Sequence, residues 1–213
     1  MPVRAARKHS IDANLVVALD VVGELAEADK LITEYADWAA RALGAETPSA
    51  DQLAGLAVRV WVDRGRLDDA IARGRKVLKY RRKALPPGHY LTGMVLLDLG
   101  RAQVLRGELQ AAKRDLDEAY DILHKTTVSL PLYWVPWVQC WRGVCLTKLE
   151  RYADAEPLLV EAETGVRTSS HTLPGQHRTT VEHLIALYKK WGRPAQAAEW
   201  RKKLPQADSP LRR

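Results

Sequence analysis

Apolar residues recur at helical spacing on both sides of Gly107, and their pattern predicts a pair of helices. Upstream, from about Tyr90 to Arg106, they cover a broad helical face and comprise Leu91, Met94, Val95, Leu97, Leu99, Val104 and Leu105. Downstream, from about Leu109 to Leu123, they fall three and four residues apart, at Leu109, Ala112, Leu116, Ala119, Tyr120 and Leu123. Because glycine tolerates the left-handed backbone with which helices commonly end, Gly107 marks the turn between them. We therefore predict an antiparallel helix pair.

The same turn position recurs along the whole chain in steps of 42, 42, 43 and 42 residues. The turn positions are Gly23, Gly65, Gly107, Glu150 and Gly192, and an alanine follows each five residues later, at Ala28, Ala70, Ala112, Ala155 and Ala197. Self-similarity with a period of about 20 to 50 residues is typical of solenoids and propellers. A small residue at the alanine position lets the second helix approach the first closely. Glu150, which replaces the turn glycine, predicts a turn that either avoids positive φ or bears it with strain.

Five such units fill nearly all of the 213 residues, so no room is left for a separate catalytic domain. The predicted fold is all-α, a right-handed α-solenoid of about five antiparallel helix pairs. We expect a single array over 11–204, with repeats at about 11–47, 50–88, 90–130, 133–172 and 177–204. A basic N-terminal arm (1–10) precedes it and a tail (205–213) follows.

Two units share an ordered set of residues beyond the glycine and the alanine. The third has Leu99, Gly100, Gly107, Leu109, Ala112, Leu116 and Ala119, and the fourth has Gly143, Leu146, Tyr152, Ala155, Leu159 and Ala162. This order resembles the tetratricopeptide repeat (TPR), whose usual length is about 34 residues. At 42 residues the unit is similar to the long-helix variety of kinesin light chains and of repeat regions associated with bacterial serine/threonine kinases.

The resemblance implies a concave groove, lined by the first helix of each unit, that binds a peptide or protein segment. The expected function is a non-catalytic protein–protein interaction scaffold of bacterial, kinase-associated signalling. The family's groove positions, carried onto this chain, give the partner-binding candidates Arg59, Asp63, Asp98, Arg101, Trp137, Trp141, Lys148, Glu182 and Lys189.

Two features of these candidates leave alternatives open. Arg59 and Arg101 occupy equivalent positions and suit carboxylates or phosphates along an extended ligand, because guanidinium forms bidentate bonds. The alternative is an internal salt bridge, such as Asp98 with Arg101. The tryptophans of segment 133–141 suit either a binding hot spot or the core, and we expect Trp137 or Trp141 to be exposed and Trp134 buried.

The net charge of +7 and the pI near 9.5 add a second candidate function. A basic balance attracts nucleic acid, anionic membranes or acidic proteins without choosing among them. Nucleic-acid or anionic-ligand binding through a basic groove is therefore the alternative to a peptide ligand. The sequence disfavours nucleic acid, because no recognised motif is present and the positive charges are interleaved with Asp and Glu.

The remaining chemistry points away from cofactors. Cys140 and Cys145 lie five residues apart on one predicted helix, where they point in different directions and are expected to stay reduced. The six histidines include no pair at the four-residue spacing of a metal site, so we expect no metal, cofactor or catalytic activity. No apolar run approaches the roughly 20 residues of a membrane span. A cytoplasmic location follows as the prediction.

The first predicted helix is apolar around most of its circumference. Its apolar residues are Ile11, Ala13, Leu15, Val16, Val17, Ala18, Leu19, Val21 and Val22. A terminal repeat needs a polar outer face, because no neighbour covers it. We therefore expect this helix to be covered by a second copy of the chain or by an upstream domain.

Overall fold

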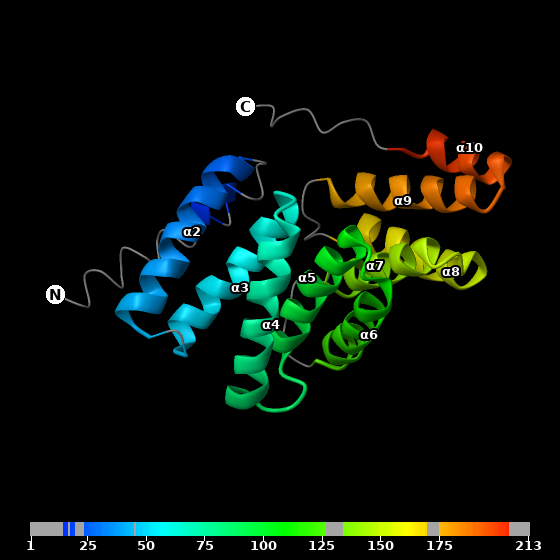
Figure 1. Cartoon of the computed structure of the whole chain (residues 1–213). Coiled ribbons are helices and arrows are strands. Elements are labelled where there is room, and N and C mark those ends of the chain that lie inside the picture. The colour runs from blue at the N-terminus through cyan, green and yellow to red at the C-terminus, as the bar shows by residue number, and fades with distance from the viewer. Residues whose placement is uncertain are drawn as a thin grey trace.

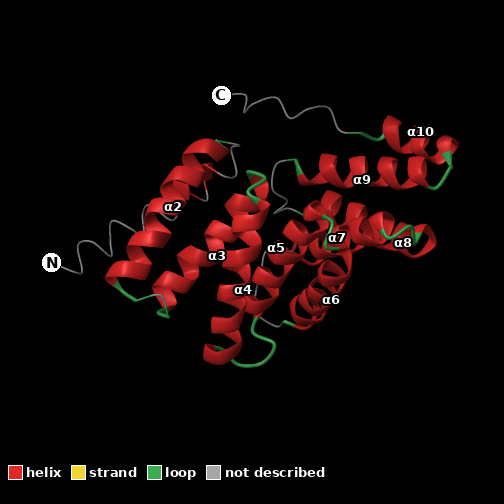
Figure 2. Cartoon of the chain, viewed as in Figure 1, coloured by secondary structure: helices red, strands yellow, loops and turns green. Residues whose placement is uncertain are grey.

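The computed structural model describes residues 15, 16, 18, 19, 24–44, 46–126, 134–169 and 175–204, and this part is built from helices alone (Figures 1 and 2). The nine full helices of these ranges are α2 (Leu25–Ala42), α3 (Pro48–Asp63), α4 (Leu67–Ala84), α5 (Tyr90–Arg106), α6 (Leu109–Lys125), α7 (Trp134–Lys148), α8 (Tyr152–Thr168), α9 (Gln176–Lys190) and α10 (Pro194–Lys202). The helix pair predicted around Gly107 is confirmed, and its second helix extends to Lys125.

Four turns between the paired helices share one hydrogen-bonding pattern. The backbone N–H of the residue after the turn position reaches back to a carbonyl five residues earlier, in Arg66 to Trp61, Glu108 to Gln103, Arg151 to Leu146 and Arg193 to Tyr188, at 2.8 to 2.9 Å. This pattern requires a left-handed residue at the turn. The turn residues have φ of 75° at Gly65, 92° at Gly107, 60° at Glu150 and 72° at Gly192. Glu150 therefore adopts positive φ, while Gly23 lies outside the described residues.

Small residues stand on both sides of the helix crossings. Ala28, Ala70, Ala112 and Ala155 are fully buried, and Ala197 is 2% exposed. On the facing first helices, a Cβ atom at Gly100 would lie 2.5 Å from Cγ of Leu116, and one at Gly143 would lie 2.6 Å from Cγ of Leu159. The repeated glycines and alanines thus set how closely the helices of a pair approach.

The pairs stack in chain order into a solenoid (Figure 1). Each of α4, α6 and α8 packs against its own first helix and against the first helix of the next pair. The first helices also touch one another in sequence, α3 with α5, α5 with α7 and α7 with α9. First helices therefore form one surface of the described array and second helices the other. The core between them is mostly Leu, Val and Ala, with Leu96, Leu97, Leu99, Leu116, Leu159, Leu184 and Leu187 almost completely buried.

Little of the apolar N-terminal helix is described. Leu15, Val16, Ala18 and Leu19 are helical, and Val16 is fully buried whereas Leu15 is 46% exposed. The rest of this helix, the basic arm and the tail lie outside the described residues, so the expected cover by a second copy or an upstream domain stays a prediction. Among the described helices, none combines the length and the apolar character needed to cross a bilayer.

Candidate functional site

The stacking of α3, α5, α7 and α9 aligns residues that share a repeat position. One line consists of Leu56, Asp98, Trp141 and His183, and a second consists of Gln52, Met94, Trp137 and Thr179. Both lines run along the surface formed by the first helices, and we call this surface the groove. Several of the sequence-predicted groove residues, including Asp98, Trp137 and Trp141, belong to these lines.

Arg101 is the centre of a buried charge cluster in the groove. Its Nη1 donates to Oδ1 of Asp98 at 3.0 Å, and its Nη2 donates to Oδ1 of Asp63 at 2.5 Å. The Arg101 side chain is only 8% exposed. Its guanidinium carbon also lies 5.6 Å and 5.2 Å from the ring centres of Trp137 and Trp141. Of the two alternatives for this arginine, the internal salt bridge is the one present, so Arg101 is committed to the protein and does not continue a ligand-binding ladder from Arg59.

Burial dominates the electrostatics of this cluster. It raises the pKa of Asp98 to about 6, although Arg101 and Arg59 both act to lower it. On α9, burial lowers the pKa of His183 to about 4, with a smaller contribution from Lys148. At neutral pH the groove therefore holds an ionised Asp98 on α5 and a neutral His183 on α9.

The tryptophans of α7 are all buried. Trp134, Trp137 and Trp141 are 5%, 8% and 5% exposed, which confirms the expectation for Trp134. The expectation that Trp137 or Trp141 is exposed is wrong. Both lie between neighbouring first helices, with their rings 6.0 Å apart at 88°, and the Trp141 ring is 5.5 Å from that of His183. The stack closes over them from α5 and α9, a contact that no single repeat contains.

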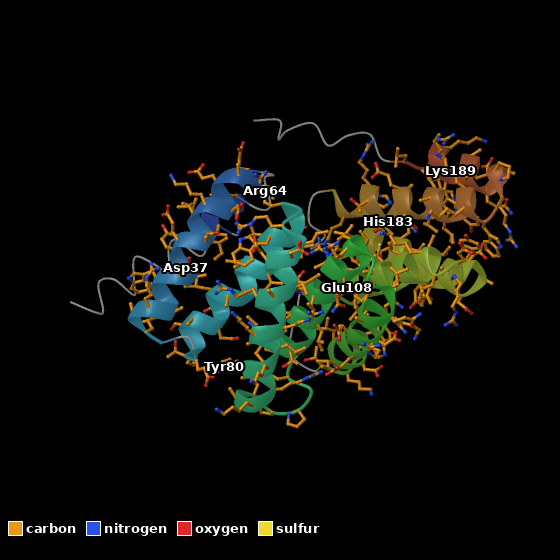
Figure 3. All side chains as sticks on the ribbon, in the orientation of Figure 1. Asp37, Arg64, Tyr80, Glu108, His183 and Lys189 are labelled. Atoms are coloured by element: carbon orange, nitrogen blue, oxygen red, sulfur yellow. The ribbon has the colours of Figure 1, made fainter. Side chains whose placement is uncertain are left out.

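The other candidates differ in exposure and in hydrogen bonding. Lys148 is exposed, and its Nζ donates to the carbonyl oxygen of Val104 at 2.9 Å, which ties α7 to the end of α5. Glu182 is exposed and accepts a hydrogen bond from Nε of Arg178 at 3.0 Å. Lys189 is exposed in the last turn of α9, where Figure 3 labels it. Arg59 is partly buried on α3.

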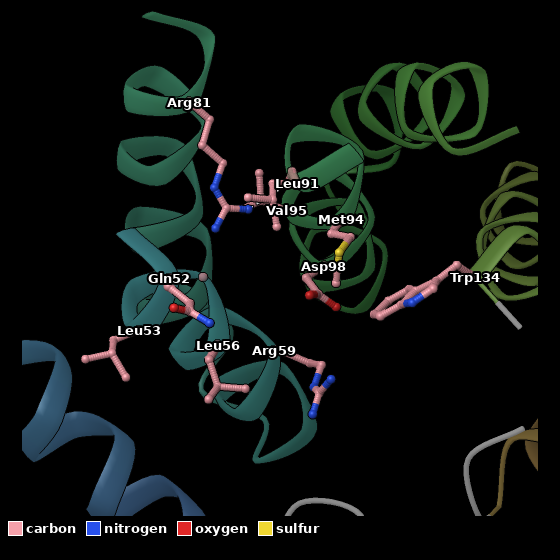
Figure 4. Close-up of a pocket in the computed structure, with 11 residues that line it drawn as sticks. Gln52, Leu53, Leu56, Arg59, Arg81, Leu91, Met94, Val95, Asp98 and Trp134 are labelled. Carbon is pink, nitrogen blue, oxygen red and sulfur yellow. Dashed lines mark hydrogen bonds between the residues drawn. The ribbon is translucent and has the colours of Figure 1, made fainter. Parts of the chain in front are cut away.

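A pocket of about 240 Å³ opens where α3, α5 and the start of α7 meet (Figure 4). Its apolar lining consists of Leu53, Leu56, Leu91, Met94, Val95 and Trp134, and its polar lining of Gln52, Arg59, Arg81 and Asp98. Arg59 and Asp98 come from facing helices at the side of the pocket where Trp134 also lies, while Arg81 lies apart from them on α4. The pocket thus combines apolar walls with one charged end.

The base of the pocket is fixed by a buried ion pair. Nε of Arg81 donates to both carboxylate oxygens of Asp51, at 3.1 and 2.9 Å, and the two side chains are 4% and 7% exposed. Nη1 of Arg81 also donates to the carbonyl oxygen of Leu91 at 2.5 Å. Gly55 leaves the space for this arginine, because a Cβ there would lie 2.5 Å from its Nη2. The ion pair therefore links α3, α4 and α5 beneath the pocket.

Most of the pocket lining was missed from the sequence, which predicted only Arg59 and Asp98. The repeat spacing carries a signal for part of it. Met94 is at the repeat position of Trp137, and Leu91 is at that of Trp134, each pair separated by 43 residues. Aligning the aromatic positions of the fourth unit with the third would have identified these two residues.

The two cysteines of α7 are shielded from solvent. Cys140 and Cys145 are buried free thiols, and burial raises their pKa values to about 12 and about 11. A thiol with such a pKa is a poor nucleophile at neutral pH. Among the described residues no group of three or more His, Cys, Asp or Glu side chains is placed to hold a metal ion.

Comparison with known proteins identifies the fold. No protein-family model matches the sequence, and no curated protein does so either. Two crystal structures of a protein described as a kinesin light chain with nearly identical TPR-like repeats, from Podosopora anserina, superpose with TM-scores of 0.68 and 0.66 at 18% identity. They cover 92% of this chain and 92% and 93% of their own. The fold is a TPR-like solenoid.

A further TPR-like match is the crystal structure of BtubC (BKLC) from P. vanneervenii, with a TM-score of 0.71 at 17% identity over 95% of this chain and 80% of that one. At these identities the likeness concerns the fold. It confirms the all-α solenoid predicted from the 42-residue spacing and the resemblance to long TPR units.

Proposed function

We propose that this TPR-like solenoid is a non-catalytic protein–protein interaction scaffold that holds a peptide or protein segment in the groove of its first helices. The pocket between α3, α5 and α7 carries this proposal, because three successive first helices supply its walls. A segment lying along the groove would place one large apolar side chain in it. The kinase-associated signalling context stays a prediction from the resemblance, and the cytoplasmic location stays a prediction from the cysteines and the apolar runs of the sequence.

The size and lining of the pocket suit an anchor residue. Complete burial of a Leu, Met or Phe side chain contributes about 1.5–3 kcal/mol, and a few such anchors dominate most interfaces. The Arg81–Asp51 and Arg101–Asp63 pairs hold the neighbouring helices in place before a ligand arrives. Pre-organisation of this kind reduces the entropy lost on binding.

The charges of the groove favour a protein segment over nucleic acid. Arg101 is occupied by two carboxylates, and Lys148 donates to a backbone carbonyl. Arg59, at the charged end of the pocket, faces Asp98 from the opposite helix. A phosphate chain would need a continuous row of accessible cations, which this arrangement does not provide.

Selection of binding peptides from a random peptide library, followed by calorimetry, tests the proposal. We expect selected peptides to share an apolar anchor residue and to lose affinity by tenfold or more, about 1.4 kcal/mol, in Met94→Arg, which places a charge in the pocket. Thr164→Arg, at an exposed position on the outer helix α8, makes the same change in charge and is the matched control. Unchanged affinity in Met94→Arg, with the fold retained, would refute groove binding.

A further inference from the structure

A second, larger pocket lies on the side of the second helices. It measures about 480 Å³ and is enclosed by α2, α4 and the first turns of α3. Its small apolar residues are Ala36, Ala40, Ala50, Ala54 and Val77, and its basic residues are Arg73, Lys76, Lys79 and Lys83, with Tyr80 among them. Its two acidic residues, Asp51 and Glu46, are paired with Arg81 and Lys83. Figure 3 labels Asp37 on α2 and Tyr80 on α4. We name this site the α4 basic pocket.

The charge of α4 departs from the pattern of the repeat. The helix carries seven basic residues and two acidic ones, and both acidic residues are in its first turn. Arg73, Lys76 and Lys79 share their repeat positions with Asp115, Glu118 and Asp121 of α6, 42 residues later. The fold is therefore built with acidic residues at these positions in the neighbouring unit. Basic side chains at these three positions are therefore not a requirement of the fold, whereas Arg81 of the same helix is part of a buried ion pair.

Part of this charge is used within the protein. Arg73 contacts Asp37 at 3.4 Å and Lys83 contacts Glu46 at 3.6 Å, both at the pocket, while Arg75 and Arg82 pair with Glu108 and Glu118 of the neighbouring unit at 3.1 and 2.6 Å. Lys76 and Lys79 have no ion pair with any residue of the described ranges, and both are exposed. They stand three residues apart on α4, so their ammonium groups project from the same helical face.

We propose that the α4 basic pocket binds an acidic peptide segment of a protein partner. Two carboxylates of the segment contact Lys76 and Lys79. An apolar side chain between them packs on the floor of the pocket, which consists of its four alanines. The floor and Tyr80 offer an apolar surface that a phosphate backbone cannot use. The one arginine fork in the lining is already held by Asp37. These features favour a peptide over a polynucleotide, since bidentate phosphate recognition depends on available arginine.

This surface is separate from the groove and does not depend on the function proposed for it. The groove pocket is lined mainly by α3, α5 and α7, whereas the α4 basic pocket lies between α2, α4 and the first turns of α3. Arg81 lines the first pocket, and its ion-pair partner Asp51 lines the second. The scaffold would then hold two segments at once, one on each face. Two linked contacts raise the overall affinity for a partner well above that of either alone.

Fluorescence anisotropy with a labelled synthetic peptide tests the inference. The probe alternates pairs of glutamate with single leucines, and it is titrated with the full chain at low ionic strength. We expect Lys76→Glu with Lys79→Glu to weaken binding by about tenfold or more, because two attractions become repulsions. Arg114→Glu with Lys125→Glu on α6 makes the same change in net charge at two exposed sites, and we expect it to change the affinity less than threefold, or about 0.7 kcal/mol.

Two more titrations separate this site from the alternatives. A probe with serine in place of each leucine should bind several-fold more weakly, and Met94→Arg should bind the original probe as the wild type does. Equal weakening by the α4 and α6 double variants would overturn the proposal, as would equal affinity for the serine probe or for a uridine oligonucleotide. Circular dichroism melting of each variant establishes that the fold is retained, and loss of binding in Met94→Arg alone would place the probe in the groove instead.

Discussion

Glu150 offers a sharp test of how this array encodes its turns. It is the non-glycine residue with positive φ in the described part, at 60°, where the equivalent turns have glycine. Its backbone makes the same turn, with Arg151 N–H donating to the carbonyl of Leu146 at 2.9 Å. A left-handed conformation costs a non-glycine residue about 1–2 kcal/mol. Glu150 therefore carries strain that glycine would relieve.

The expected gain can be estimated from the turn itself. Glycine gives back part of the relief, because its unfolded chain has about 0.4–1 kcal/mol more conformational entropy to lose. The net stabilisation of Glu150→Gly should be about 0.5–1 kcal/mol, which raises Tm by roughly 1–4 °C for a chain of this size. No atom lies within 4 Å of a Cβ built on Gly107 in the equivalent turn. The penalty at such a turn is therefore one of backbone conformation and not of packing.

Urea unfolding followed by circular dichroism measures this difference, with Gly107→Glu as the reciprocal variant and Glu150→Ala as the side-chain control. Gly107→Glu should lose about 1 kcal/mol, and Glu150→Ala should gain nothing, since alanine keeps the same backbone penalty. If Glu150→Gly leaves the unfolding free energy unchanged or lowers it while Gly107→Glu shows its loss, the left-handed backbone at position 150 is not strained.

Three further predictions concern the core and the buried titratable groups. Gly100→Ala should destabilise the chain by about 1–3 kcal/mol in the same urea assay, because its Cβ would lie 2.5 Å from Cγ of Leu116. The control Lys190→Ala, at an exposed position, should have little effect. The pKa of Asp98 is raised to about 6 from the ordinary 3.8, so folding favours its protonated form. Its contribution to the unfolding free energy is present below about pH 4, and up to about 3 kcal/mol is lost as pH rises through 6. Asp98→Asn should therefore remove a decline in stability between pH 4 and 6. It should also expose the opposite slope from His183, because the lowered pKa of His183, about 4, makes its contribution to stability complete above about pH 6.5 and lost as pH falls toward 4. Identical pH profiles of the wild type and Asp98→Asn would contradict this assignment. The pKa values of Cys140 and Cys145 are raised to about 12 and about 11, so both thiols should react with a thiol reagent at neutral pH only as fast as the chain opens. Adding denaturant should therefore accelerate labelling. Rapid labelling of the native chain would show that the thiols are accessible.

The fold was largely predictable because its rules are local and repeated. The turn residues Gly65, Gly107 and Gly192 have the positive φ that glycine favours, and the alanine five positions after each is buried. The site was predicted less well, because its residues meet only through stacking. Arg101 lies 38 residues from the Asp63 that holds it, and only the superposition of two units brings them together.

The sequence by itself determined the period, the helix pairs and the turns, since each depends on residues within one unit of about 42 positions. Tertiary structure alone decided which side chains are exposed. Trp137 and Trp141 are equally apolar in the sequence whether they bind a ligand or fill the core, and the approach of α5 and α9 buried both. The same stacking opened the pocket beside Trp134 and left Lys76 and Lys79 exposed on α4. Burial depends on neighbours from other units, and their distances are set by how the helices pack.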